Sequence, residues 1–178
     1  MKATGIVRRI DDLGRIVIPK EIRRTLRIRE GDPLEIFTAR EGEVILKKYS
    51  PISELGQFAK EYAEALYETL GTPILISDRD EMIAVSGISK KDYLNRPLSP
   101  SAEEFILKRS VTTEKHEETV EFVVGQIEAI KSYCIVPIIA AGDAIGAVYV
   151  LSKVHFLGDV EEKVIEAAAL FLAKQMEN

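Results

Sequence analysis

The stretch Asp12-Leu13-Gly14-Arg15-Ile16-Val17-Ile18-Pro19 combines the end of a turn, a short β-branched strand and a proline that stops the strand. Residues 11–14 have the aspartate and glycine composition of a turn. On the other side of that turn, residues 5–10 are also rich in β-branched side chains and predict a second strand. The sequence therefore predicts two adjacent strands, 5–10 and 15–18, joined by a tight turn.

The rest of the first fifty residues predicts one short helix and a hairpin. Residues 20–26 follow a proline, which suits a helix start, and Ile22 and Leu26 lie four positions apart on one helix face. Residues 34–38 and 44–49 predict strands on either side of a glycine turn. A module of about fifty residues buries too little surface to fold alone without disulfides or metal. We therefore expect an obligate dimer in which two copies share one core.

The charge of the chain is divided unevenly between these fifty residues and the remainder. The net charge of the whole chain is −5. Residues 1–50 hold 12 Lys and Arg against 8 Asp and Glu, a net of +4, whereas residues 51–178 hold 12 against 21, a net of −9. A basic module joined to an acidic one indicates nucleic-acid binding by the basic part.

Composition limits the class of protein further. Apolar residues make up 46% of the 178 residues, enough for a core, yet no run approaches the ~20 apolar residues of a membrane helix. The first residues lack the apolar segment of a signal peptide, and the single cysteine, Cys134, excludes an internal disulfide. We expect a cytoplasmic, nucleoid-associated protein with no membrane contact, in which Cys134 is a buried and unreactive thiol.

The acidic part begins after Ser50-Pro51-Ile52-Ser53 with a helix over residues 53–70. Its apolar residues recur at i, i+3, i+4 and i+7, with Ser53 as the expected N-cap and Gly71 as the stop. A last helix is expected over 159–176, capped by Asp159 with Glu162 three positions on.

Between these helices the pattern predicts an antiparallel sheet with one inserted helix. Ser99-Pro100 is expected to cap the inserted helix, which runs to about Arg109, with Ser101 and Glu104 at capping-box spacing. The strands are expected at 73–77, 82–86, 120–127, 133–140 and 144–151, with turns at 78–81 and 142–143.

The first part of the chain resembles the AbrB family of bacterial transition-state regulators. The resemblance is carried by residues 5–24, most specifically by 12–19, and continues through Gly31-Asp32 and Leu34-Glu35-Ile36 to about Tyr49. It implies a swapped-hairpin β-barrel dimer. The second part resembles a GAF domain through its order of elements. The resulting class is α+β, with domains at 1–50 for DNA binding and dimerisation, a linker helix at 51–71, and a GAF-like domain at 72–178.

The AbrB resemblance also implies that arginines on one face contact double-stranded DNA. The matching positions here are Arg8, Arg15, Arg23 and Arg24, to which we add the neighbours Arg9 and Lys20. The planar fork of arginine donates two bonds at once to phosphate or guanine. By strict alternation Arg8 shares a side with apolar Ile6 and Ile10, so the orientation of Arg8 remains open.

No long recognition helix is present in the first fifty residues. We therefore expect affinity to depend on backbone contacts and DNA shape, with a loose sequence preference and a strong dependence on salt. The family resemblance implies control of sporulation genes by activation and repression.

The second part gives no sign of catalysis or of a bound cofactor. His116 and His155 stand 39 residues apart with no metal-ligand spacing, and residues 142–146 form a hairpin rather than a phosphate-binding loop. Some GAF-like domains are similar to free methionine sulfoxide reductases, but that chemistry uses several cysteines. Asp78 and Asp80 are expected as solvated turn residues. Tyr133 and the 120–126 strand fit either a pocket wall or core packing.

We expect no metal and no resident cofactor, and leave open an unidentified small-molecule effector. The helices at 53–70 and 159–176 could pack on each other or pair across chains. Pairing across chains gives a tetramer, the outcome we favour, if its partner differs from that of residues 1–49, and a dimer if the partner is the same. The chain is thus expected to be a transcription regulator rather than an enzyme. The alternatives are a DNA-organising protein without an effector and an antitoxin, whose toxin-binding tail would be disordered.

Overall fold

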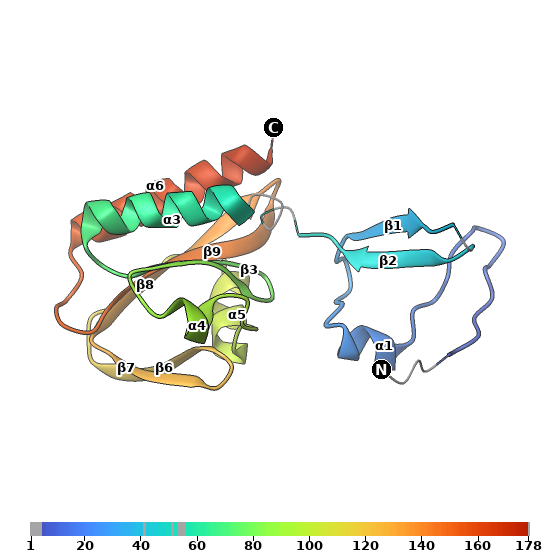
Figure 1. The fold of residues 1–178 in the computed structure, drawn as a ribbon, viewed down its shortest axis with the longest axis horizontal. Coiled ribbons are helices and arrows are strands. Elements are labelled where there is room, and N and C mark those ends of the chain that lie inside the picture. Colours follow the sequence, from blue (N-terminus) through green and yellow to red (C-terminus); the bar gives the residue numbers. More distant parts are fainter. Residues whose placement is uncertain (1–4, 41, 51, 53–55, 178) are drawn as a thin grey trace. The chain divides into compact units, whose positions relative to one another are not determined.

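The computed structural model describes residues 5–177 except 41, 51 and 53–55 (Figure 1). The chain divides into two compact units, Met1–Tyr49 and Ser50–Asn178. Residues 51–71, expected as a linker helix, therefore fall within the second unit. Among the helices of the described ranges, none has the length and apolar composition needed to cross a membrane.

The first unit contains helix α1 (Lys20–Thr25) and a hairpin of strands β1 (Leu34–Thr38) and β2 (Val44–Lys48). These confirm the predicted helix and the second predicted hairpin. Ile36 is paired with Leu46 in the antiparallel register, and the hairpin turns at Gly42, whose φ of +80° favours glycine.

The two strands predicted at 5–10 and 15–18 are not formed within the single chain. Only the turn between them is closed, by Gly14 N–H donating to Asp11 O and Asp11 N–H donating to Arg15 O, both at 3.0 Å. Beyond this turn neither segment pairs as a strand with any described residue of its own chain, so the prediction from local sequence is wrong for the isolated protomer.

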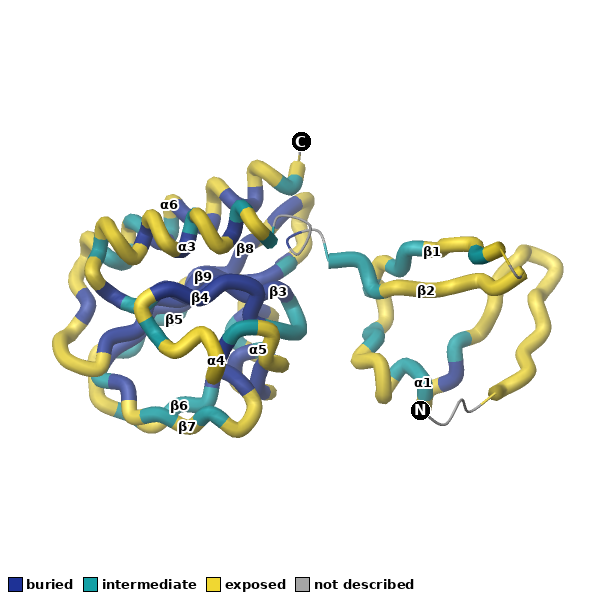
Figure 2. The backbone as a smooth tube through the Cα atoms, viewed as in Figure 1, coloured by how far each residue is buried: buried dark blue, intermediate teal, exposed yellow. Residues whose placement is uncertain are grey.

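The first unit has almost no core of its own (Figure 2). Pro19 is the one buried residue among the described residues 5–49. Twelve large apolar side chains are exposed instead: Ile6, Val7, Ile10, Leu13, Ile16, Val17, Leu26, Ile36, Phe37, Val44, Ile45 and Leu46. Because cross-strand neighbours such as Ile36 with Leu46 and Phe37 with Ile45 occupy alternate faces, both faces of the hairpin are apolar and uncovered.

The second unit is built on a five-stranded antiparallel sheet with the strand order β4-β3-β9-β8-β5. Its strands are β3 (Ile74–Asp78), β4 (Met82–Ser86), β5 (Thr112–Glu114), β8 (Ser132–Ala140) and β9 (Asp143–Ser152). Alternate residues of these strands enter two different cores, as the two-residue period of a strand requires. Val148 and Val150 face one core, and Ala147, Tyr149 and Leu151 face the other.

Each face of this sheet is covered by different elements (Figure 1). Helices α3 (Gly56–Leu70) and α6 (Asp159–Met176) lie antiparallel on one face. The other face is covered by the short helices α4 (Lys90–Tyr93) and α5 (Pro100–Leu107) together with the hairpin of β6 (Glu118–Val123) and β7 (Gln126–Ile130). The α+β class and the antiparallel sheet flanked by helices are thus confirmed.

Several local predictions in the second unit need correction. The strand expected at 120–127 is the β6–β7 hairpin, which turns at Gly125 with a φ of +84°. The expected cap of α5 at Ser99 is instead confirmed, because Ser99 Oγ accepts from Ala102 N–H at 3.1 Å. Helix α6 begins with Gly158 as its N-cap, and Gly158 N–H donates to Glu161 Oε2 at 3.0 Å.

Of the two predicted ends of the helix over 53–70, only the C-terminal end lies within the described residues. Its expected N-cap, Ser53, lies outside the described residues. Its C-terminal stop is confirmed, since Gly71 has a φ of +66° and donates its N–H to Tyr67 O at 2.7 Å.

Candidate nucleic-acid interface

Two segments of the first unit carry the six basic residues expected to bind DNA. Arg8, Arg9 and Arg15 lie on the exposed segment that contains the turn at residues 11–14. The helix α1 carries Lys20, Arg23 and Arg24.

Helix α1 brings its three basic residues together. Arg23 and Arg24 follow Lys20 by three and four positions, a spacing that places side chains on neighbouring parts of one helix surface. Pro19 starts the helix with a φ of −57°, the value that its ring imposes. Lys20 and Arg24 are exposed, whereas Arg23 is half-buried.

Five of the six side chains have no acidic partner in the part of the chain that the structure describes. Arg8, Arg9, Lys20, Arg23 and Arg24 make no ion pair with any residue that the structure describes. The Nε of Arg23 is also buried without a hydrogen-bond acceptor among those residues. Uncompensated positive charge of this kind is available to attract phosphate.

Arg15 is the exception, because it is held by Asp11. Arg15 Nε donates to Asp11 Oδ2 at 2.8 Å, and Arg15 N–H donates to Asp11 Oδ1 at 2.7 Å. The backbone and side-chain hydrogen bonds from Arg15 keep the pKa of the Asp11 carboxyl below its usual value. Sequence reasoning placed Asp11 in the turn but did not predict its contact with Arg15.

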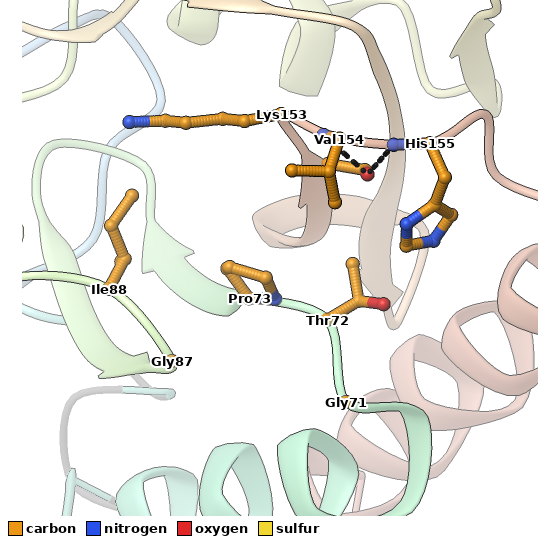
Figure 3. A pocket seen from close by; sticks show the side chains of 9 residues that line it. Gly71, Thr72, Pro73, Gly87, Ile88, Lys153, Val154 and His155 are labelled. Carbon is orange, nitrogen blue, oxygen red and sulfur yellow. Dashed lines mark hydrogen bonds between the residues drawn. The ribbon is translucent and has the colours of Figure 1, made fainter.

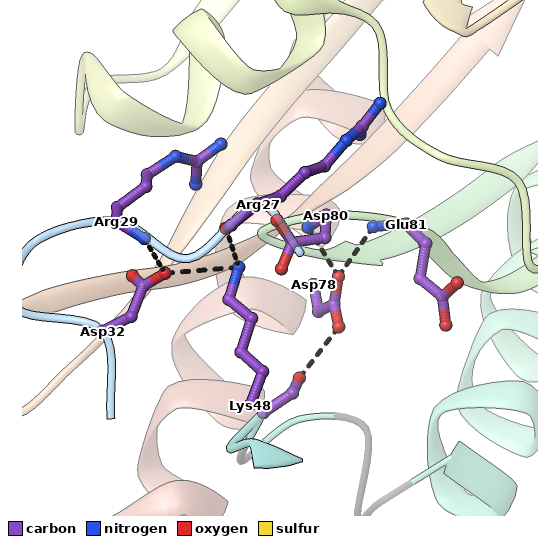
Figure 4. A network of polar contacts seen from close by, with 8 residues as sticks. Arg27, Arg29, Asp32, Lys48, Asp78, Asp80 and Glu81 are labelled. Atoms are coloured by element: carbon purple, nitrogen blue, oxygen red, sulfur yellow. Dashed lines mark hydrogen bonds and ion pairs between the residues drawn. The ribbon is translucent and has the colours of Figure 1, made fainter. Parts of the chain in front are cut away.

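A second carboxylate fixes the loop that leads into β1 (Figure 4). The Asp32 side chain is 1% exposed, and its Oδ2 accepts from Arg29 N–H at 2.8 Å. Lys48 Nζ lies 3.3 Å from the same oxygen and donates to Arg27 O at 3.0 Å. These two contacts of the Lys48 ammonium therefore stabilise the fold of the first unit.

The acids at the β3–β4 turn differ from the expectation of solvated residues (Figure 4). Asp78 is buried, and its Oδ1 accepts from Asp80 N–H at 2.7 Å and from Glu81 N–H at 2.8 Å. Ser50 Oγ donates to Asp78 Oδ2 at 2.9 Å. Burial and the charges of Asp78 and Asp80 raise the pKa of Glu81. Asp78 thus stabilises the turn.

Cys134 and the two histidines, considered above for catalysis and metal binding, differ in burial. Cys134 is buried, and this burial raises the pKa of its thiol, which disfavours the thiolate that a nucleophile needs. His116 and His155 are exposed, and His116 Nδ1 lies 3.1 Å from Glu114 Oε2. Within the described ranges, no group of His, Cys, Asp and Glu could hold a metal ion.

Tyr133 and the 120–126 segment belong to the core. The rings of Phe122 and Tyr133 meet edge to face with centroids 5.4 Å apart, and Phe122 contacts Tyr149 in the same manner at 5.7 Å. Tyr149 is fully buried, and Ser77 Oγ lies 3.2 Å from its hydroxyl. Core packing therefore accounts for this cluster.

A shallow pocket of about 280 Å³ lies at one end of the sheet (Figure 3). It is lined by Gly71, Thr72, Pro73, Gly87, Ile88, Ser152, Lys153, Val154 and His155. Its volume is at the lower limit of the range typical of small-molecule sites. Lys153 Nζ forms an ion pair with Glu128 Oε2 at 2.7 Å.

Comparison with known proteins identifies the family. The family model for "Stage V sporulation protein T C-terminal, transcription factor" matches residues 54–177. The chain is 65% identical to stage V sporulation protein T of Bacillus subtilis (strain 168) over 177 residues, covering 99% of both chains. The chain belongs to the stage V sporulation protein T family.

The first unit of this family member has its own relatives. It is 63% identical over 51 residues to the transition state regulatory protein AbrB of Bacillus subtilis (strain 168), covering 29% of this chain and 52% of AbrB. The model for "Antidote-toxin recognition MazE, bacterial antitoxin" matches residues 7–54. The first unit of the chain is thus AbrB-like, as its sequence predicted.

The second unit has the fold of a GAF domain. The GAF domain of an Acinetobacter phosphoenolpyruvate-protein phosphotransferase superimposes with a TM-score of 0.58 at 12% identity, covering 68% of this chain and 81% of that chain. At this identity the likeness shows the fold alone. The matched family model describes a transcription factor, not an enzyme.

Proposed function

We propose that the chain is a DNA-binding regulator of sporulation transcription whose basic residues contact duplex DNA from a dimeric first unit. The observation that carries this proposal is the set of uncompensated basic residues between positions 8 and 24, on a unit similar to AbrB. Two copies would place twelve basic side chains around one two-fold axis. Their placement fits binding that depends on phosphate contacts.

The dimer is supported by the exposed apolar residues of the first unit. Both faces of the β1–β2 hairpin are uncovered, and residues 5–10 and 15–18 have unpaired backbone edges. A second copy can supply the missing strands and cover one face of the hairpin, at a gain of about 25 cal/mol per Å² of apolar surface. We propose that the barrel closes only between two chains.

The proposal predicts salt-dependent binding to double-stranded DNA. For the full-length protein, log K should fall linearly with log salt concentration, with a slope near −0.9 for each phosphate neutralised. A dimer that uses at least three basic residues per chain should therefore show a slope of roughly −5 or steeper. Fluorescence anisotropy on labelled duplexes between 50 and 200 mM salt measures it. A flat response would contradict DNA binding through these residues.

We also propose that α3 and α6 join two such dimers into a tetramer. Phe58, Tyr62 and Phe171 form an aromatic cluster across the two helices, with ring centroids 5.4 to 6.0 Å apart. Leu170, which precedes Phe171 in sequence, is 60% exposed, on the side of α6 away from its buried residues. An exposed apolar strip on paired helices suits a four-helix contact between subunits.

Replacing Leu170 with glutamate should convert the tetramer into a dimer, because a carboxylate would have to be desolvated in the helix contact. Light scattering on residues 1–178 measures the mass. The matched control is Leu107→Glu on α5, a leucine of similar exposure, which should leave the mass unchanged. A mass that is unaltered by Leu170→Glu would place the contact elsewhere.

The second unit is proposed to regulate DNA binding through this assembly or through a small-molecule effector. The pocket between Gly71 and His155 is the candidate position for an effector. A ligand that binds only the folded state raises the melting temperature, so a thermal-shift screen on the full-length protein tests this role. We propose a cytoplasmic location at the nucleoid, which follows from DNA binding.

The alternatives have less support. An antitoxin was expected to have a disordered tail, whereas α3 through α6 form a domain with two apolar cores. A DNA-organising protein without an effector is not favoured, because the family model is that of a transcription factor.

A further inference from the structure

We infer that Asp11 is a positioning residue for DNA binding, whose carboxylate holds the Arg15 guanidinium by its Nε so that the outer edge of the guanidinium faces the DNA. This inference rests on the proposed DNA-binding function. The negative charge of Asp11 by itself would weaken binding to the DNA polyanion, whereas this role of Asp11 strengthens it.

The two oxygens of Asp11 have separate tasks. Oδ1 accepts from the backbone N–H groups of Leu13 at 3.0 Å and Arg15 at 2.7 Å, which closes the turn. Oδ2 accepts from Arg15 Nε at 2.8 Å. Gly14, with a φ of +76°, permits the tight return of the chain that brings Arg15 back to Asp11.

The contact through Nε leaves the binding edge of the arginine available. A guanidinium has five N–H donors, of which one is on Nε and four are on the two terminal nitrogens. The terminal pair makes the bidentate contact with a phosphate or with guanine O6 and N7. The Arg15 side chain remains 69% exposed although it is tied to Asp11, so its outer edge is accessible.

Holding the side chain in place before binding favours the complex. A free arginine loses much rotamer freedom when it is fixed on DNA, whereas a side chain that is already oriented loses less. The electrostatic repulsion between Asp11 and nearby phosphates opposes this gain in affinity. Asp11 therefore favours binding only if orientation of Arg15 outweighs this repulsion, and the two effects predict opposite results when the charge is removed.

The decisive variant is Asp11→Asn in the full-length protein. Asparagine keeps an Oδ1 that can accept from the two backbone N–H groups, but it loses the anionic Oδ2 and turns an N–H toward Arg15 Nε. We expect affinity for duplex DNA to fall roughly tenfold at fixed salt. Repulsion alone predicts tighter binding, so an affinity equal to or above that of the wild type would overturn the inference.

Asp12→Asn is the matched control. Asp12 is exposed, adjacent in sequence, and makes no hydrogen bond or ion pair with any described residue. Removing its charge should leave DNA affinity unchanged or slightly raised. An equal loss in Asp12→Asn and Asp11→Asn would overturn the inference, since the contact with Arg15 could not then be the cause.

A double-mutant cycle with Arg15→Ala distinguishes positioning from a general effect on the turn. If Asp11 acts through Arg15, Asp11→Asn costs nothing further in the Arg15→Ala protein. A full additional loss there would overturn the inference in favour of a structural role. Should Asp11→Asn fail to fold, Asp11→Glu keeps the charge and displaces the carboxylate by one methylene. It should still weaken binding, and wild-type affinity in Asp11→Glu would count against positioning.

The failure of this inference is distinguishable from the failure of the proposed function. A wild-type protein that binds no duplex DNA at low salt overturns both. A wild-type protein that binds DNA, together with an Asp11→Asn variant that binds as well, overturns the positioning role alone.

Discussion

Replacing Arg15 with alanine is expected to weaken binding to duplex DNA by at least about 30-fold, while the protein remains a dimer. Loss of one bidentate arginine contact costs roughly 1–3 kcal/mol, and a dimer loses two, or roughly 2–6 kcal/mol. Arg15 is the largely exposed basic residue whose guanidinium is already oriented by a neighbouring carboxylate. Anisotropy titrations measure the affinity, and light scattering measures the dimer.

Arg23→Ala should have an effect in the same direction. Arg23 is half-buried at α1 and makes no ion pair with a described residue, so its charge is available to a phosphate. If either arginine contacts a phosphate, its removal should also reduce the magnitude of the salt slope by about 2 per dimer.

The control for both variants is Arg109→Ala in the second unit. Arg109 is an exposed arginine whose Nη2 lies 3.5 Å from Asp143 Oδ1. It should change DNA affinity by less than about twofold, as expected for a surface ion pair in the unit that does not carry the proposed DNA-binding residues. Retained affinity in Arg15→Ala and Arg23→Ala would refute the assignment of the DNA-binding residues. Loss of the dimer would mean that these arginines are structural.

Replacing Gly146 with alanine is expected to lower the stability of the second unit by roughly 3 kcal/mol, a fall of about 10 °C in melting temperature. Gly146 is buried in β9, paired with Asp78 of β3 and Ile138 of β8. A Cβ at this position would lie 2.0 Å from the carbonyl oxygen of Ser77. Because that atom is backbone in a central strand, relief requires the sheet to shift.

Gly56→Ala is the matched control, since a Cβ at Gly56 meets nothing within 4 Å. It lies at the start of α3, where alanine has the higher helix propensity, so stability should stay the same or rise by up to about 1 kcal/mol. Thermal unfolding followed by circular dichroism compares the two. Equal melting temperatures for Gly146→Ala and the wild type would show that β9 and β3 are less closely packed than the structure has them.

The sequence alone predicted the helices and turns whose ends are set by residues close together in the chain. The period of apolar residues predicted the helix at 159–176 with the same bounds as α6. Glycines with positive φ marked the turn at Gly142 and the end of α3 at Gly71. The same signal was present at Gly125, but the apolar run 120–127 was interpreted as one strand although its residues belong to two.

Other features depend on residues that are distant in sequence, and pattern alone did not reveal them. Asp78 was expected in solvent because turn acids usually are, yet Ser50, 28 positions earlier, donates to its carboxylate. Ser101, at capping-box spacing from Glu104, donates its hydroxyl to Glu121 O at 3.1 Å, 20 positions along the chain. Such partners are set by packing and not by local composition.

The sequence by itself determined that this chain has a basic AbrB-like part and an acidic GAF-like part, and it named the basic residues of the first. Those conclusions depend on composition, residue period and turn chemistry, which are properties of neighbouring residues. The tertiary structure decided which charges are compensated. It showed that Asp11 holds Arg15 and that Asp32 forms an ion pair with Lys48. It also showed that residues 5–18 have no strand partner among the described residues of their own chain. The physical reason is that an ion pair or a strand pairing depends on which side chains and backbone edges meet in space.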